Sequence, residues 1–317
     1  MIKKFEVPKY IIVLGTTYSG SGAIFDYLVG RNDLHNPLEG EEYLLPILPN
    51  GFMDLEAAAG KAFVPETSEY HIIKFREISE KLSNFWSNGP KKKELGKFSK
   101  KFNENVNQLI NDIIVADYPM KILWRELLKS PLEKNLSRIK NLTGMRESIP
   151  STRLLVPQKK FIKAVEKMHD NLFKTNSDKR PTILSQAGSG WNPIESTKYF
   201  DDCKKILITR DPRDQYLEIK KYKKGQSVMG FVDWYKEMQS RLKSINDENI
   251  LQVRFEDFVN HNKKYVGIIC DYLNLSDKVG SNYSAELSKK NIYKFKDYKD
   301  HKEIQLIEDN LKDFLYN

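Results

Sequence analysis

The residues best suited to chemistry lie in one short run, positions 15–22, which reads GTTYSGSG. Glycines such as Gly20 and Gly22 let a backbone approach a ligand closely, and the hydroxyl groups of Ser19 and Ser21 can donate hydrogen bonds. A turn of this kind between a strand and a helix aims unpaired backbone N–H groups and the positive end of the helix dipole at an anion. We therefore predict a phosphate-binding turn at residues 15–22, called the cradle below.

The cradle departs from the nucleotide-hydrolase pattern GxxxxGK[ST] at one position. Gly15 and Gly20 have the spacing of that pattern, but Ser21 stands where the lysine belongs. That lysine normally neutralises the β and γ phosphates, so its absence argues against ATP or GTP as the ligand. The alternative interpretation of the turn is a glycine-rich connection with no ligand.

A strand and a helix are expected to position the cradle. Residues 10–14 form a short apolar run rich in β-branched side chains, which is typical of a buried strand, and apolar residues from Ala23 to Leu28 follow at helical spacing. Further strands are predicted at 182–186, 205–209 and 250–253. Helices are predicted at 157–171, 193–200, 215–223, 231–245, 263–273 and 303–315. Strands that alternate with helices indicate an α/β fold with a mainly parallel sheet.

Residues 35–150 lie between the cradle and the alternating strands and helices, and they do not continue that alternation. Residues 35–48 are predicted to form a short strand or a loop, 50–59 a turn and a helix, and 71–76 a strand or a helix. From 78 to about 142 the pattern is mainly helical and poor in glycine. We therefore expect a single domain, 1–317, with a helical insertion at about 78–150.

Arg210 forms a second point of interest because it directly follows the predicted strand 205–209. In open parallel sheets, ligands bind beyond the carboxyl ends of the strands. The cradle and Arg210 both lie at such ends. They are therefore expected to contact one ligand, although about 190 residues separate them in the sequence.

Four segments together resemble the sulfotransferases that use 3′-phosphoadenosine 5′-phosphosulfate (PAPS), in particular the bacterial members that act on carbohydrates. Residues 15–28 (GTTYSGSGAIFDYL) resemble their 5′-phosphosulfate loop, and 206–222 (ILITRDPRDQYLEIKKY) their 3′-phosphate motif. Residues 253–259 (VRFEDFV) and 288–298 (SKKNIYKFKDY) are similar to two later segments of the family. The resemblance implies a P-loop-kinase-like three-layer α/β sandwich, PAPS as the sulfonate donor and no metal.

The resemblance also implies roles for individual residues. Arg210 falls on the arginine that binds the 3′-phosphate, a task that suits a planar guanidinium. Glu218 stands where the family has a serine, and we expect Lys220 or Lys221 to offset its charge. Tyr18 stands where the family has a lysine or arginine, so we assign it both a catalytic and a cofactor-binding role. The full set of implied cofactor-binding residues is Thr17, Tyr18, Ser19, Gly20, Ser21, Gly22, Ala23, Arg210, Glu218, Lys289 and Asn291.

Sulfonate transfer also needs a base for the acceptor proton and positive charge near the transferring group. Glycan-specific members of the family place a glutamate about 20 residues after the loop. Glu41 is the nearest match and is our candidate catalytic base, with Glu39 and Glu42 as alternatives. The candidate residues for binding an acceptor glycan or glycolipid are Glu39, Lys74, Arg76, Lys159 and Lys160.

The composition of the chain limits which classes of partner, which cellular compartment and which metal sites we expect. A net charge of +9 and a pI of about 9.1 favour anionic partners, among them a membrane surface contacted peripherally, but no nucleic-acid recognition module is visible. Cys203 and Cys270 are expected to be buried thiols, and no signal peptide is seen, so we expect a cytoplasmic protein. The five histidines are scattered, so no metal site is predicted.

Two other functional classes remain open at this point. A P-loop nucleotide kinase would share the strand–turn–helix unit, although Ser21 disfavours it. A catalytically inactive relative that binds a nucleotide or glycan is favoured by Tyr18 and Glu218. The sequence does not indicate an oligomeric state.

Overall fold

The computed structural model describes residues 6–119, 129–143, 151–173, 180–222 and 227–316. Those parts of the predicted insertion at 120–128 and 144–150 lie outside the described residues. The chain divides into two compact units, each with its own core. The first comprises Met1–Ile47, Lys91–Phe98 and Phe173–Asn317, and the second comprises Leu48–Pro90 and Ser99–Leu172.

A four-stranded parallel sheet forms the centre of the first unit, in the order β4-β1-β5-β6. The strands are β1 (Tyr10–Gly15), β4 (Thr182–Ser185), β5 (Cys203–Thr209) and β6 (Ile250–Arg254). Tyr10 pairs with Thr182 on one side and with Cys203 on the other. Residues 10–14 are fully buried, which explains why this strand lacks polar alternation. The α/β fold with a central parallel sheet is thereby confirmed.

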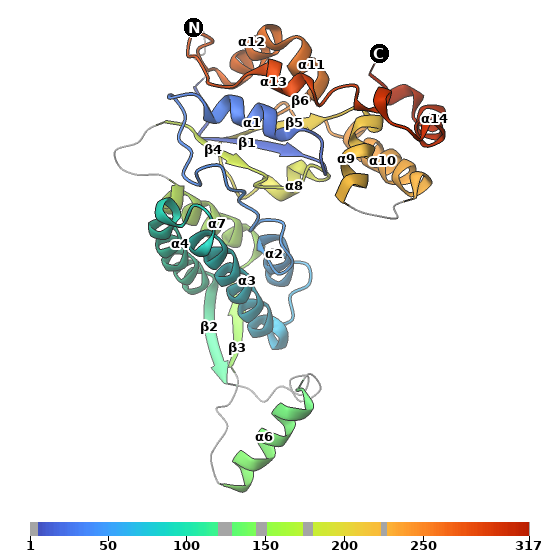
Figure 1. Ribbon diagram of the computed structural model, residues 1–317. Helices are drawn as coiled ribbons and strands as arrows, with labels where there is room; N and C mark the ends of the chain where they lie inside the picture. Colours follow the sequence, from blue (N-terminus) through green and yellow to red (C-terminus); the bar gives the residue numbers. More distant parts are fainter. Residues whose placement is uncertain (1–5, 120–128, 144–150, 174–179, 223–226, 317) are drawn as a thin grey trace. The chain divides into compact units, whose positions relative to one another are not determined.

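Helices and loops cover both faces of this sheet (Figure 1). On one face, α1 (Ser21–Val29), α11 (Phe255–Asn260) and α12 (Asn262–Leu273) pack on Ile11, Val13, Ile206 and Ile208. On the other face, the ring of Tyr10 packs edge-on against Phe200, and the short helix α8 (Pro193–Thr197) lies on this side. The result is the expected three-layer arrangement.

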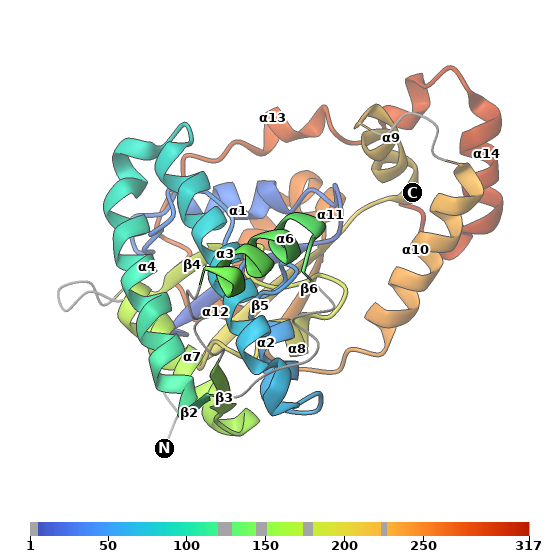
Figure 2. The same ribbon diagram turned by 90° about the horizontal axis from the view of Figure 1, so that it is seen from below.

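Four further helices complete the first unit. They are α9 (Pro212–Tyr222), α10 (Val228–Lys243), α13 (Ala285–Lys289) and α14 (His301–Asn310), with single 3-10 turns at Lys294–Asp297 and Lys312–Phe314. Figures 1 and 2 both show α9, α10 and α14 side by side. Residues 35–48 form a loop with two isolated bridges to β4, at His35 and Glu42.

The second unit is mainly helical. It contains α2 (Phe52–Ala59), a 3-10 turn at Pro65–Thr67, α3 (Ser68–Asn88), most of α4 (Lys92–Ile113), α6 (Pro131–Leu142) and α7 (Gln158–Phe173). The strand β2 (Ile114–Pro119) lies within the stretch that was expected to be mainly helical, and it pairs antiparallel with β3 (Ser151–Leu155), which follows that stretch. The core of the second unit includes ring contacts of Phe52 with Phe75 and His169, and of Trp86 with Phe102.

Residues 71–76 belong to a 21-residue helix, so the strand alternative for this segment is wrong. Ile72, Phe75, Ser79, Leu82 and Trp86 are buried at helical spacing along α3. A six-residue window contains too few turns to reveal this period, whereas the longer stretch shows it clearly.

Candidate functional site

The cradle has the backbone geometry of an anion-binding turn. Tyr18 and Gly20 both adopt left-handed conformations, with φ of 57° and 84°, and α1 begins at the next residue, Ser21. A Cβ atom at Gly20 would lie 2.6 Å from the ring of Phe255, so this position requires glycine. The N–H of Ala23 donates to the carbonyl oxygen of Gly20 (3.1 Å), whereas those of Ser21 and Gly22 have no backbone acceptor among the described residues.

Two glutamine side chains, which the sequence reasoning missed, hold the cradle in shape. The Gln186 amide accepts a hydrogen bond from Gly15 N (3.3 Å) and donates one to Ser21 Oγ (3.0 Å). Gln215 Nε2 donates to the carbonyl oxygen of Thr17 (2.6 Å) and to the hydroxyl of Thr16 (3.2 Å). Both glutamines follow the carboxyl end of a strand, β4 and β5 respectively, and that position was a signal for them.

A cavity of about 470 Å³ opens in front of the cradle. Its wall consists of the following residues: Gly15, Thr16, Thr17, Tyr18, Ser19, Gly20, Ser21, Gly22, Glu42, Leu44, Ile47 and Gln186. A Cβ atom at Gly22 would meet no atom within 4 Å, so the first turn of α1 faces open space. The buried hydroxyl of Ser19 has no hydrogen-bond partner among the described residues. Open space, helix N–H groups and an unused donor fit a phosphate or phosphosulfate group.

Arg210 lies beside the cradle and is 4% exposed. Its guanidinium donates hydrogen bonds to the backbone carbonyls of Tyr18 (3.1 Å) and Asn291 (2.6 Å) and lies over the ring of Phe255. Arg210 thus joins the cradle to the carboxyl-terminal segment 288–298. No carboxylate of the described residues lies within ion-pair distance of it, although its charge favours the ionised forms of nearby Asp214 and Glu218, and its Nε has no hydrogen-bond partner there. A buried guanidinium in this condition fits an anionic ligand group.

The segment that contains Asn291 is fixed by two carboxylates of α9. Asp214 is fully buried and accepts hydrogen bonds from Tyr293 N (2.7 Å) and Phe295 N (3.1 Å). Glu218 forms an ion pair with Lys294. Burial opposes ionisation of Glu218, but the hydrogen bond from Lys294 and the nearby positive charges outweigh burial and lower its pKa.

The charge of Glu218 is therefore offset by a lysine that the sequence reasoning did not select. Of the two lysines expected to offset this charge, Lys220 instead contacts Glu303 and Tyr298. Lys221 contributes its charge to the lowered pKa of Glu218, although without a direct bond. Lys289 is exposed and pairs with Glu286 on its own short helix (2.7 Å).

Asp211, the residue after Arg210, belongs to a hydrogen-bond network that includes Tyr316 near the end of the chain. The Asp211 side chain accepts hydrogen bonds from Arg213 (2.7 Å) and Tyr316 N (2.8 Å). The backbone N–H of Asp211 donates to Glu256 Oε1 (2.9 Å). Glu256 is fully buried, and this burial, together with the charge of Asp211, raises its pKa to about 7.

Tyr18 stacks face to face on Tyr222, the last residue of α9. The ring centroids are 5.1 Å apart and the planes differ by 2°. Both rings are exposed, at 40% and 61%. The Tyr18 hydroxyl forms no hydrogen bond with the part of the chain that is described, so its ring rather than its hydroxyl is engaged.

The three candidate glutamates occupy different positions around the cavity. The backbone carbonyl of Glu39 accepts a hydrogen bond from Lys91, and the Glu41 carboxylate lies 4.0 Å from the same amine. Only Glu42 of the three belongs to the cavity wall. Partial burial of its carboxyl group, and secondarily the charge of Glu41, raises the pKa of Glu42.

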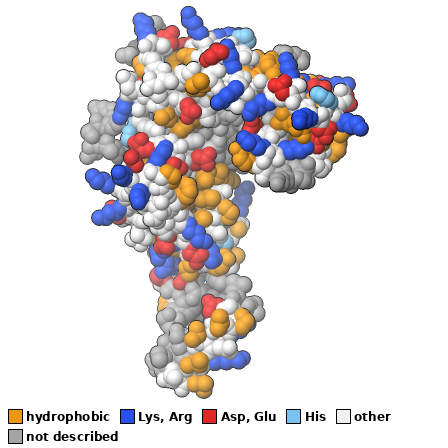
Figure 3. Space-filling model, viewed as in Figure 1, with side chains coloured by type: hydrophobic (Ala, Val, Ile, Leu, Met, Phe, Trp, Pro, Cys, Tyr) orange, Lys and Arg blue, Asp and Glu red, His pale blue; other side chains and the backbone are white. Residues whose placement is uncertain are grey.

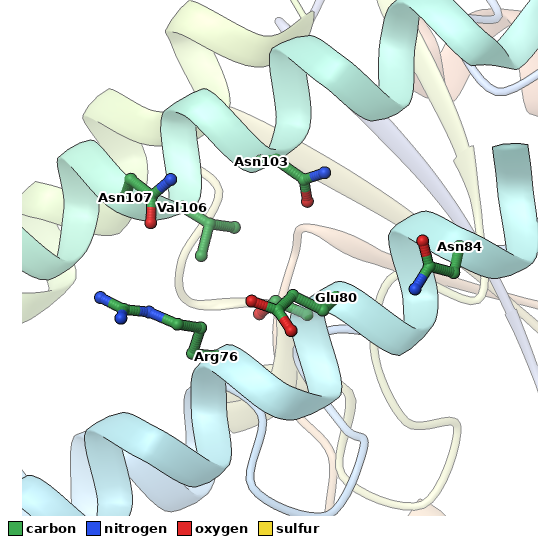
Figure 4. A pocket seen from close by; sticks show the side chains of 7 residues that line it. Arg76, Glu80, Asn84, Asn103, Val106 and Asn107 are labelled. Carbon is green, nitrogen blue, oxygen red and sulfur yellow. The ribbon is translucent and has the colours of Figure 1, made fainter.

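The four basic residues assigned to substrate binding all belong to the second unit. Lys74 pairs with Glu77 on α3 (2.8 Å), and Lys159 and Lys160 are exposed in the first turn of α7. Arg76 lines a polar groove of about 310 Å³ between α3 and α4 (Figure 4). Its other lining residues are Ser79, Glu80, Asn84, Asn103, Val106 and Asn107.

Comparisons with known proteins identify only distant structural likenesses. No protein-family model matches the chain, and no curated protein matches it. A sulfotransferase domain from the curacin biosynthetic pathway matches with a TM-score of 0.41 and 13% identity, covering 97% of this chain and 98% of that chain. A sulfotransferase domain from the olefin synthase of Synechococcus PCC 7002 matches with a TM-score of 0.41 and 14% identity, covering 96% of each chain. A sulfotransferase from Alicyclobacillus acidocaldarius matches with a TM-score of 0.37 and 12% identity, covering 96% and 95%. Similarities this distant do not establish an activity.

Three further observations concern the described residues only. Among them, no helix is both long and apolar enough to cross a membrane. Within the same ranges, no group of three or more histidines, cysteines or carboxylates is arranged to hold a metal ion. Cys203 and Cys270 are both free thiols, and burial raises the pKa of Cys203 to about 12.

Proposed function

We propose that the protein is a sulfotransferase of the bacterial carbohydrate type, which moves a sulfonate from PAPS to a hydroxyl or amine of a glycan. The observation that carries this proposal is the cradle, an anion-binding turn with an unused buried hydroxyl at Ser19 and no lysine at position 21. Arg210 supports it as a buried cation that joins the cradle to segment 288–298. We further propose that both units belong to one transferase domain with a helical insertion near 78–150.

The roles of the protein groups follow from their positions. PAPS, when bound, supplies an activated sulfonate on its 5′-phosphate. The N–H groups at the start of α1 and the Ser19 hydroxyl bind the oxygens of that phosphosulfate. Arg210 offers its remaining N–H groups to the 3′-phosphate, while Lys294 keeps Glu218 from repelling that group. Tyr18 lines the cavity and holds the cradle through its stack on Tyr222.

We propose Glu42 as the residue that accepts the proton of the acceptor. Glu41 was the sequence-based candidate, and its role stays a prediction. Glu42 is favoured because it belongs to the cavity wall and because its raised pKa makes it a stronger base than an ordinary carboxylate. Glu41 instead lies near Lys91 and raises the pKa of Glu42 through its charge.

The polar groove in the second unit supports a glycan as the acceptor. Its walls carry Arg76, Glu80 and three asparagines, and Figure 4 shows these side chains along two helices that face each other. None of the five forms a side-chain hydrogen bond or ion pair with the described residues. Carboxamides offer a donor and an acceptor together, which matches a sugar hydroxyl. We therefore keep Arg76 as a proposed acceptor contact, and Lys74, Lys159 and Lys160 as secondary ones.

A second candidate function is a nucleotide- or glycan-binding protein without activity. Tyr18 favours it, because this neutral side chain replaces the cation that would stabilise the leaving phosphate. A kinase is disfavoured by Ser21. The free thiols at Cys203 and Cys270 fit a reducing compartment, so we propose that the protein acts in the cytoplasm.

Calorimetry with 3′-phosphoadenosine 5′-phosphate (PAP), ADP and ATP tests the proposal. A transferase of this kind binds PAP at least about tenfold more tightly than ADP, the equivalent of 1.4 kcal/mol. A preference for ATP would reject it in favour of the kinase. Sulfate transfer from labelled PAPS to a panel of glycans then separates the enzyme from the inactive binder, which binds PAP but transfers nothing.

A further inference from the structure

Helix α6 (Pro131–Leu142) has a capping motif at its N-terminus. The Ser130 hydroxyl accepts a hydrogen bond from Glu133 N (3.3 Å), and the Glu133 carboxylate accepts one from Ser130 N (2.7 Å). Pro131 occupies the first helical position, where its missing N–H group costs nothing. This reciprocal capping pattern, followed by a proline, fixes the start of the helix through contacts between neighbouring residues.

One side of α6 is apolar and uncovered. Leu132, Leu136, Ile139 and Leu142 follow one another at steps of four, three and three residues, which places them along one stripe of the helix. They are 76%, 56%, 56% and 87% exposed, so no described residue covers them. Figure 3 shows hydrophobic side chains, in orange, at the surface of the region of α6. A stripe of four large aliphatic side chains is more than the single exposed apolar residues that are normal on a protein surface.

The charged residues of α6 favour one class of partner. Lys134 and Arg138 are exposed on the helix, one turn apart, whereas its acidic residue Glu133 is engaged in the capping pattern. At 3.6 residues per turn, Arg138 falls beside the edge of the apolar stripe. The whole chain carries a net charge of +9. An apolar stripe with basic residues on the polar side of the helix is typical of helices that lie in the surface of an anionic membrane.

We propose that α6 docks the protein on an anionic lipid surface. The four aliphatic side chains enter the boundary between headgroups and acyl chains, and Lys134 and Arg138 contact lipid phosphates. With 12 residues the helix is about 18 Å long, too short to span a bilayer, so it lies in the plane of the surface. This inference goes beyond the proposed transfer reaction and does not depend on it.

The size of the stripe argues against a second copy of the chain as the partner. Four aliphatic side chains offer roughly 250–500 Å² of apolar area. A stable protein interface buries about 800 Å² on each partner. A lipid surface sets no such minimum, because it surrounds the inserted side chains on all sides.

Vesicle flotation of the full chain tests this inference. We expect the protein to float with vesicles of equimolar phosphatidylcholine and phosphatidylglycerol, and about tenfold less with phosphatidylcholine alone. Leu136→Ser removes apolar area without changing charge and should reduce binding at least about fivefold. Lys134→Gln and Arg138→Gln should each reduce binding to the anionic vesicles about fivefold and weaken its dependence on salt.

The control is Leu287→Ser, because Leu287 is 71% exposed on α13 and lies outside the stripe. It should bind vesicles as the wild type does. Circular dichroism should show all variants folded, since every replaced side chain is exposed. Equal flotation of wild type and Leu136→Ser would overturn the inference, as would the absence of flotation. Self-association without lipid that Leu136→Ser abolishes would assign the stripe to a second copy instead.

Discussion

Replacing Glu256 by glutamine should change how the stability of the protein depends on pH. Glu256 is fully buried, its Oε1 accepts the N–H of Asp211, and its Oε2 accepts no hydrogen bond from the described residues but lies 3.6 Å from Arg254 Nε. The amide of a glutamine keeps the acceptor at Oε1 but never ionises. The substitution therefore removes the titration and the ion pair with Arg254, and it preserves the hydrogen bond from Asp211 N.

The sign and size of the effect follow from the raised pKa. The folded protein holds this proton up to about pH 7, whereas the unfolded chain releases it near 4.5. The unfolded state therefore binds fewer protons between these values, and the free energy of unfolding falls as pH rises through this window. A difference of about 2.5 pKa units at 1.36 kcal/mol each corresponds to about 3 kcal/mol. Above about pH 7 this loss is complete and constant.

Urea denaturation of wild type and Glu256→Gln across this window measures the effect. Relative to wild type, the variant should gain about 3 kcal/mol as pH rises from about 4 to 8. Any fixed cost of the buried NH₂ group cancels, because it is the same at each pH. A difference between the two proteins that stays constant with pH would refute the reasoning.

Glu303→Gln is the control of opposite sign. The pKa of Glu303 is lowered: burial opposes ionisation, but the hydrogen bonds and charge of Lys220 outweigh it. Its ionised form therefore stabilises the fold above its unfolded pKa, and this contribution is lost as pH falls. The Glu303 variant should lose stability relative to wild type as pH rises, whereas the Glu256 variant gains it.

Three predictions concern the cavity. Arg210→Ala should weaken PAP binding in calorimetry by about 10- to 150-fold and ADP binding much less; equal losses would make Arg210 purely structural. Glu42→Gln should lower labelled-sulfate transfer by about 10²–10⁴-fold at unchanged PAP affinity. Glu41→Gln should lower the same transfer much less, and a larger loss for Glu41→Gln would identify Glu41 as the base. Tyr18→Phe should keep the melting temperature because the ring stack remains, while Tyr222→Ala should cost about 0.5–1.5 kcal/mol; a large loss for Tyr18→Phe would show that its hydroxyl matters.

The sequence determined those features that depend on neighbours along the chain. A β-branched run, a turn of small residues and an apolar helical period predicted β1, the cradle and α1, because each pattern is set by local backbone preferences. The alternation of further strands and helices predicted the parallel sheet. The same local reasoning could not decide between strand and helix for 71–76, since that window is shorter than two helical turns.

Only the tertiary structure decided which distant side chains support the cradle and which line the cavity in front of it. Gln186 and Gln215 support the cradle, and Lys294 neutralises Glu218, through contacts that span 76 to 198 residues. Glu41 and Glu42 are neighbours with the same chemistry, yet only Glu42 lies in the cavity wall. Its backbone bridge to Ser185 sets that placement. Pairing with another strand determines which way successive side chains point, and a sequence does not record which strand that partner is.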